Sequence, residues 1–125
     1  MSFTTCIRAA APDVMAPDGS EVRLLAAASR GSMAQFTLPP GAVSKAVAHR
    51  TVEEVWLVMQ GQGRMWRKSG VQEETVELRP GVSISIHAGT SFQFRNDGDE
   101  LLDCVGVTMP PWPGMDEAVE VPGIW

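Results

Sequence analysis

Two ionisable side chains lie five positions apart in the most regular apolar stretch of the sequence. They are His49, which is one of only two histidines, and Glu54, and both fall between Gly41 and Gly61. An imidazole and a carboxyl group within reach of each other can transfer protons, and both are also common metal ligands. Any chemistry visible in the sequence is therefore expected to centre on this pair.

The stretch around the pair predicts two β-strands joined by a polar turn at residues 50–53. Successive side chains of a strand point to opposite faces, so each strand has one face that carries a member of the pair. These two faces are predicted to hold Lys45, Val47 and His49 on the first strand, and Glu54, Trp56 and Val58 on the second. If they point inward, the polar pair lies among apolar neighbours.

Such surroundings would alter the acidity of both groups. Burial should raise the pKa of Glu54, while an ionised Glu54 should raise that of His49, so that the two titrate together. His49 then becomes a candidate general acid/base oriented by Glu54, and Lys45 a candidate for attracting an anion or polarising a carbonyl at the pocket mouth. Two plainer interpretations remain open: a hydrogen-bonded structural pair, and an ordinary surface lysine.

The rest of the chain predicts an all-β domain spanning residues 1–125. Its 12 glycines and 9 prolines end each apolar run early, which favours short strands over helices. About ten strands separated by turns indicate a barrel or sandwich. The predicted strands include residues 3–8, 21–27, 32–38, 64–68, 71–78, 82–87, 91–96 and 101–109. Residues 110–125, with Trp112 and Trp125, are expected to form an ordered irregular arm that covers the barrel or a subunit interface.

Charge and hydropathy argue against two classes of partner. The net charge is −5, and no basic run exceeds Arg67-Lys68, so nucleic acid is not an expected partner. No segment approaches the ~20 apolar residues of a membrane span, and no secretory leader is visible, which indicates a cytoplasmic protein. Cys6 and Cys104 are expected to be free thiols, although a disulfide stays open if the fold brings them together.

Spaced glycines around the central stretch and a second stretch make the sequence similar to a small single-domain cupin. The first cupin motif is matched by Gly41, His49, Glu54 and Gly61, and the second by Gly81, Gly89 and Asn96. The resemblance implies a cupin-type double-stranded β-helix, a jelly-roll barrel, with the irregular arm at its C-terminal end. It also implies pairing into homodimers.

Both motifs depart from the family pattern at metal-ligand positions. Metal-binding cupins use three histidines and one glutamate, but Val47 and Phe92 stand here at two of the histidine positions. Two remaining ligands fall short of the three that a catalytic metal generally takes. The sequence therefore predicts no cofactor. The alternative is one divalent metal ion held by His49, Glu54 and His87, although His87 shares the polar face of its strand.

Without a metal, the barrel would enclose an apolar pocket containing one histidine and one glutamate, as small-molecule sites often do. The expected lining is Val47, Trp56, Phe92, Phe94, Met33 and Met65. The leading hypothesis is metal-independent acid/base chemistry on a small organic molecule, an isomerisation, dehydration or other lyase step. The alternatives are a non-catalytic binding or sensing module and a metal-dependent oxygenase or isomerase.

Overall fold

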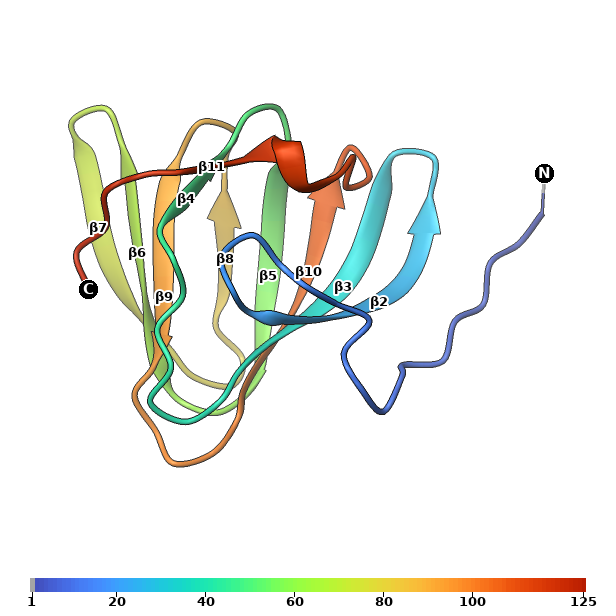
Figure 1. The fold of residues 1–125 in the computed structure, drawn as a ribbon, viewed down its shortest axis with the longest axis horizontal. Helices are drawn as coiled ribbons and strands as arrows, with labels where there is room; N and C mark the ends of the chain where they lie inside the picture. Colours follow the sequence, from blue (N-terminus) through green and yellow to red (C-terminus); the bar gives the residue numbers. More distant parts are fainter. Residues whose placement is uncertain (1) are drawn as a thin grey trace.

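Short strands ended by glycine and proline turns build two antiparallel sheets that face each other (Figure 1). The structure is a computed structural model and describes residues 2–125. One sheet has the order β1-β2-β3-β10-β5-β8, and the other β11-β4-β9-β6-β7. The strands are β1 (Val14–Met15), β2 (Glu21–Ala28), β3 (Gly31–Leu38), β4 (Val47–His49), β5 (Glu53–Gln60), β6 (Gly63–Ser69), β7 (Gln72–Leu78), β8 (Ser83–Ile86), β9 (Ser91–Asn96), β10 (Leu102–Met109) and β11 (Ala118–Glu120).

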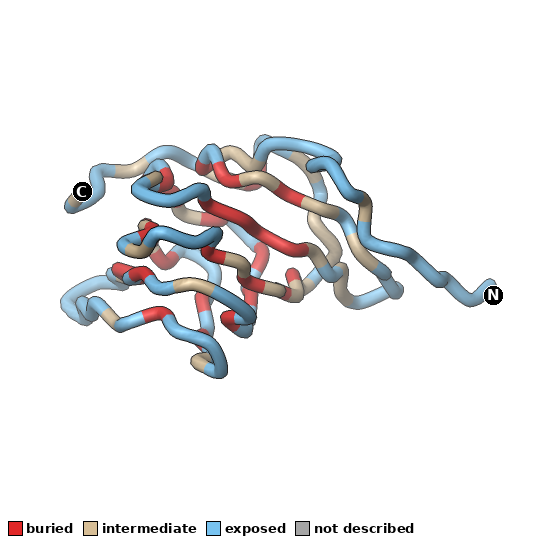
Figure 2. Tube along the Cα trace, turned by 90° about the horizontal axis from the view of Figure 1, so that it is seen from below, coloured by how far each residue is buried: buried red, intermediate tan, exposed pale blue. Residues whose placement is uncertain are grey.

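This architecture confirms the predicted all-β jelly roll. Apolar and polar residues alternate along its strands, as in β8, where Ile84 and Ile86 are buried while Ser83 and Ser85 are exposed. The inward side chains of both sheets form one core. Figure 2 marks the buried positions along the chain. Its largest fully buried members are Phe92, Phe94, Met65, Leu78, Ile86 and Leu102. No helix within residues 2–125 is long and apolar enough to cross a membrane.

The two ends of the chain differ from the prediction. Residues 3–8 form no strand; they belong to an extended arm that leads away from the sheets and leaves Phe3 and Ile7 exposed (Figure 1). The C-terminal arm is ordered as expected, but it contains a 3-10 helix, η1 (Met115–Glu117), and the strand β11, which pairs with β4. The strand β11 forms because its backbone pairs with that of β4, and the sequence has no strong local pattern that predicts either β11 or η1.

The tight connection between β4 and β5 depends on Glu117. Its carboxylate accepts hydrogen bonds from the backbone N–H groups of Thr51 and Val52, the latter at 2.7 Å. The last residue of β4 and the second residue of β5 are thereby brought together at one end of the two sheets. Those residues are His49 and Glu54.

The two cysteines are free, as expected. Cys6 is exposed on the N-terminal arm, whereas Cys104 is buried in β10. Burial, with a smaller effect from the carboxylate of Asp103, raises the pKa of the Cys104 thiol to about 12. A thiol that stays protonated is a poor nucleophile, so Cys104 belongs to the core.

Candidate functional site

His49 and Glu54 meet inside the barrel, on the faces that strand alternation predicts. His49 Nδ1 lies 3.5 Å from Glu54 Oε2, and the two side chains are only 7% and 2% exposed. The imidazole packs edge-on against two aromatic rings, Phe92 at 5.2 Å and Trp112 at 4.9 Å between centroids. The pair is therefore largely shielded from water.

Burial keeps Glu54 protonated at neutral pH. Burial, with a smaller contribution from the nearby Asp18, raises the pKa of this carboxyl group to about 8, and the indole N–H of Trp56 opposes the shift. Among residues 2–125, no cationic side chain contributes to the pKa of Glu54. Glu54 is accordingly a neutral carboxylic acid that can donate a proton.

Burial acts on His49 in the opposite direction and lowers its pKa to about 4. The negative charge of Glu117 raises it again, but by less. The expectation that an ionised Glu54 would raise the pKa of His49 is wrong, because a protonated Glu54 carries no charge with which to attract the imidazolium. The pair thus consists of a protonated acid beside an unprotonated base.

Asp18 is a site residue that sequence reasoning missed. It lies in the turn before β2, where its Oδ1 accepts hydrogen bonds from the backbone N–H of Ser20 at 2.9 Å and from the Ser20 hydroxyl at 2.7 Å. Burial raises the pKa of Asp18 despite these hydrogen bonds. The segment Asp18-Gly19-Ser20 looks like an ordinary turn, so only the fold reveals that it borders the same cavity as Glu54.

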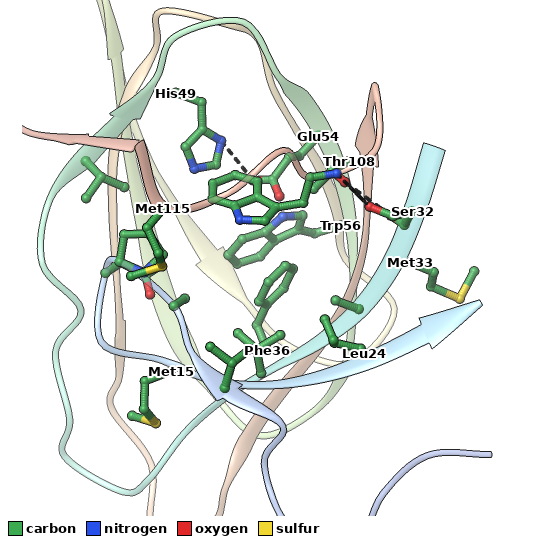
Figure 3. A pocket seen from close by; sticks show the side chains of 18 of the residues that line it. Met15, Leu24, Ser32, Met33, Phe36, His49, Glu54, Trp56, Thr108 and Met115 are labelled. Carbon is green, nitrogen blue, oxygen red and sulfur yellow. Dashed lines mark hydrogen bonds and ion pairs between the residues drawn. The ribbon is translucent and has the colours of Figure 1, made fainter. Parts of the chain in front are cut away.

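The cavity beside the pair is small and mostly apolar, with a volume of about 100 Å³ (Figure 3). Four of the predicted lining residues do line it: Val47, Trp56, Phe92 and Met33. Phe94 and Met65 are fully buried but lie outside the lining. Side chains from the first strands and the C-terminal arm complete the wall, and they include Met15, Leu24, Phe36, Trp112 and Met115.

Lys45 does not reach this cavity. Its ammonium group is on the surface, 3.8 Å from Glu120, and its side chain is 63% exposed. The alternation that placed it beside His49 fails because β4 begins only at Val47. Lys45 affects the site only through its backbone. Its N–H donates a hydrogen bond to the carbonyl oxygen of Asp18 at 2.7 Å, which holds the Asp18 turn in place.

Three buried polar atoms at the cavity have no hydrogen-bond partner among the described residues. They are His49 Nδ1, Glu54 Oε2 and Trp56 Nε1. Buried polar groups are normally paired, and an unpaired one in a native fold calls for an explanation. All three belong to side chains that line the cavity, which is the arrangement expected of a site that receives a ligand.

The proposed metal ligands do not converge. His87 points outward with a side chain 77% exposed and lies 3.6 Å from Glu53, so it cannot join His49 and Glu54. Within residues 2–125 no three histidine, cysteine or carboxylate side chains form a potential metal site. The donor set therefore does not fit a catalytic divalent metal.

A hydroxyl pair at the end of the cavity was also missed, and it holds Trp112, which was expected to cover the barrel or a subunit interface. Ser32 on β3 and Thr108 on β10 lie opposite each other and share a hydrogen bond, and Ser32 also accepts one from the backbone N–H of Trp112 at 3.0 Å. This contact fixes the C-terminal arm next to His49. The distance in sequence between Ser32 and Trp112 hid the relationship.

Solved structures share this fold at low sequence identity. An uncharacterised conserved protein with a double-stranded β-helix domain from Klebsiella pneumoniae is 16% identical, with a TM-score of 0.68 over 83% of this chain and 85% of that one. KdgF from Halomonas sp. is 16% identical, with a TM-score of 0.67 over 76% and 82%. A predicted oxalate decarboxylase from Thermotoga maritima is 20% identical, with a TM-score of 0.63 over 73% and 80%.

A family model agrees with the structural likeness. The model of the cupin domain matches residues 34–108, which run from β3 to β10 and include both glycine-spaced motifs, His49 and Glu54. Because this match covers more than half of the 125 residues, the chain belongs to the cupin domain family.

Proposed function

We propose that the protein binds a small, mostly apolar organic molecule in the barrel cavity and catalyses a proton transfer on it, as an isomerase, dehydratase or other lyase. The observation that carries this proposal is the contact between a protonated Glu54 and an unprotonated His49 in an apolar cavity. General acid/base catalysis needs one group in each of these states. Lys45 is not part of the proposed machinery.

In the dehydration of a β-hydroxy carbonyl compound, the two residues have separate roles. Glu54 gives its proton to the leaving hydroxyl, which departs as water, while His49 Nδ1 takes a proton from the carbon next to the carbonyl. The electron pair of the C–H bond forms the new double bond. The resulting carboxylate and imidazolium lie 3.5 Å apart, so the proton can return from His49 to Glu54 and restore the starting state.

In an isomerisation the same pair acts twice. Glu54 protonates the carbonyl oxygen while His49 removes a proton from the neighbouring carbon, which gives an enol. With a β,γ-unsaturated ketone this enol is a dienol, so His49 can return its proton to the γ-carbon while Glu54 recovers the proton of the enol hydroxyl, which leaves the conjugated α,β-unsaturated ketone. Inside the cavity the opposite charges of the transient carboxylate–imidazolium pair attract more strongly than in water, which offsets part of the desolvation cost of forming them.

Hydrogen exchange tests this proposal directly. The protein is incubated in D₂O with a panel of small neutral aldehydes, ketones and β-hydroxy ketones, and exchange or elimination is followed by ¹H NMR. His49→Gln and Glu54→Gln should each lower the rate by about 100-fold or more, the usual contribution of a general acid or base. The control Lys45→Ala should react like the wild type. Unchanged turnover in His49→Gln would refute the assignment.

A non-catalytic binding module is the second candidate, and the cavity mouth favours it. Three methionines, Met15, Met33 and Met115, line the cavity and remain partly exposed, together with Leu24. Methionine adapts to ligands of different shapes. Chemical-shift changes without exchange or product in the same NMR experiment would support binding alone.

We also propose that a second copy of the chain covers the outer face of the larger sheet. Val55, Leu57 and Met59 point outward from β5 and are 42–56% exposed. The extended N-terminal arm adds Phe3 and Ile7, which are 96% and 90% exposed. Apolar surface of this kind on two elements supports an interface. Sedimentation should show a homodimer that Leu57→Lys converts to a monomer, while Val71→Lys, on the exposed β6–β7 turn, leaves it intact.

A further inference from the structure

The unpaired polar atoms and the charges around the cavity define the ligand that would complete it. We propose that the cavity takes an uncharged molecule whose carbonyl oxygen accepts hydrogen bonds from the indole N–H of Trp56 and the carboxylic acid of Glu54, and that it rejects carboxylate and phosphate analogues. The inference rests on the proposed function in sharing its cavity and its acid. It concerns binding, so it can be tested without turnover.

The Trp56 indole N–H and the Glu54 carboxylic acid are two hydrogen-bond donors at the cavity that lack an acceptor. Glu54 and Trp56 are two positions apart on β5, so their side chains leave the strand on the same face. Indole nitrogen can only donate, and a protonated carboxyl group has one O–H to donate. The Trp56 N–H lies near enough to the Glu54 carboxyl group to lower its pKa, but it forms no hydrogen bond of normal geometry with it. Among the described residues, Trp56 Nε1 and Glu54 Oε2 are therefore both buried without a hydrogen-bond partner. A single carbonyl oxygen, with two lone pairs, can satisfy both.

The lining of the cavity offers an anion no positive counter-charge. Two carboxyl groups line it, Asp18 and Glu54, whereas no lysine or arginine from residues 2–125 does so. Glu117, whose charge acts on His49, adds a negative charge near the cavity, because its hydrogen bonds from Thr51 and Val52 outweigh burial and lower its pKa. A buried anion without a cationic partner carries a large desolvation cost. An oxalate-like dianion therefore finds no counter-charge here.

A cation would fit the charge but not the hydrogen bonds. An ammonium group offers only donors, so it would leave the Trp56 N–H unpaired. It would also require Glu54 to lose the proton that burial and Asp18 favour. The neutral carbonyl compound is the ligand class that satisfies the donors without a new buried charge.

The cavity suits a small ring. Its volume of about 100 Å³ approaches that of an engineered apolar cavity in another protein that holds benzene, about 150 Å³. Four aromatic side chains line it: Phe36, Trp56, Phe92 and Trp112. Glu54 and Thr108 lie together at one end of the cavity, whereas Leu24, Phe36 and Met15 lie toward the other (Figure 3). The carbonyl group of a bound ring would therefore point toward Glu54.

Four probes of similar size separate the possibilities. Benzamide is neutral with a carbonyl, benzoate is its anionic analogue, benzylammonium is cationic, and toluene has no polar group. Binding is measured by NMR titration of the intact protein at pH 7, with the Trp56 indole N–H resonance as reporter. We expect benzamide to bind at least about 10-fold more tightly than benzoate. Benzamide, and not toluene, should shift the indole resonance downfield.

The pH dependence identifies the second donor. Glu54 loses its O–H above pH 8, so benzamide affinity should fall several-fold between pH 7 and 9.5. The groups facing Glu54 are His49 on β4, Asp18 before β2 and Trp56 on β5, and His49 is already uncharged throughout this range. Glu54→Gln keeps a donor that cannot ionise, so its benzamide affinity should stay constant. The matched control Glu53→Gln, at an exposed neighbour, should behave like the wild type.

Three outcomes would overturn the inference: equal affinity for benzamide and benzoate, tighter binding of benzylammonium, or no binding of benzamide at about 10 mM. The proposed function fails separately. If benzamide binds as described but no carbonyl compound exchanges hydrogen, the proposed ligand class is supported and the proposed catalytic function is refuted. If anionic compounds exchange hydrogen, the proposed catalytic function is supported and the proposed neutral ligand class is refuted.

Discussion

His49 Nδ1 and Glu54 Oε2 lie 3.5 Å apart, yet their pKa values are shifted in opposite directions: that of Glu54 is raised and that of His49 is lowered. Burial disfavours the charged form of each, so the carboxyl group keeps its proton and the imidazole stays without one. An exposed pair would instead ionise and form a salt bridge. The difference makes the pH dependence of stability a sensitive test of the site.

Replacing Glu54 with glutamine should stabilise the protein most at alkaline pH. The folded-state pKa of Glu54 is about 8 against an ordinary 4.5, so its contribution is fully present below pH 4.5 and is lost as pH rises through 8. One titrating group changes the free energy of unfolding by up to roughly 1.4 kcal/mol per pH unit. The melting temperature of Glu54→Gln minus that of the wild type should therefore increase from pH 4.5 to 8 and then level off.

The same comparison contains its own control. Glu53→Gln removes an exposed carboxylate one position away, and its difference from the wild type should not show this increase. A melting-temperature difference for Glu54→Gln that is flat with pH would mean that Glu54 is ionised in the fold, and would remove the acid from the proposed mechanism.

His49 should govern the acid limb of stability. Its folded-state pKa is about 4 against an ordinary 6.5, so its contribution is present above pH 6.5 and is lost as pH falls through 4. His49→Gln cannot gain a proton, and its stability relative to the wild type should rise as pH falls through this window. Chemical denaturation at pH 7, 5 and 4 measures it. His87→Gln, at an outward-facing side chain, is the matched control; if it reproduces the effect, His49 is not the group that titrates.

How far the sequence predicts this site depends on the range of the interactions. Alternation within one strand correctly placed Glu54, Trp56 and Val58 on a buried face, because that rule is local. It failed for Lys45, which precedes the strand rather than lying in it. The fold followed from turns and glycine spacing distributed over the whole chain. Residues 3–8 had local β propensity, but their Cys6 contacts Leu24 of β2 only through its side chain, and no backbone ladder forms there.

The long-range contacts that bring Asp18 and Trp112 to the cavity could not be predicted. Asp18 precedes Glu54 by 36 positions, and Trp112 is 80 positions from Ser32, which holds it. Their signals are an Asp-Gly-Ser turn and a tryptophan among prolines, which are common in loops. Only the pairing of the sheets, and the hydrogen bond between the Lys45 N–H and the Asp18 carbonyl oxygen, bring the Asp18 turn to the cavity.

Replacing Asp18 should change the pKa of Glu54. Asp18→Asn removes a carboxyl group that raises the pKa of Glu54, while the amide oxygen can still accept the hydrogen bonds of Ser20. The pKa of Glu54 should therefore fall, and titration of its side-chain carbons by ¹³C NMR measures the change. Asp99→Asn, at an exposed aspartate, should leave the titration unaltered. A Glu54 pKa that is the same in Asp18→Asn and the wild type would leave burial as its only cause.

Gly106 on β10 should be sensitive to a single methyl group, because it lies under the rings that form the cavity wall. A Cβ atom there would lie 2.7 Å from Trp56 Cδ1 and 2.8 Å from Phe36 Cε2, and these rings are stacked with centroids 4.8 Å apart. Gly106→Ala should lower the free energy of unfolding by about 1–3 kcal/mol, as overpacking does, and weaken binding of neutral ring compounds. Denaturant unfolding and the NMR titration measure the two effects.

Gly98→Ala, where the nearest atoms lie at 3.6 Å, should change the free energy of unfolding by less than about 0.5 kcal/mol. If Gly106→Ala were equally mild, Trp56 and Phe36 would not form the rigid wall on which the cavity depends.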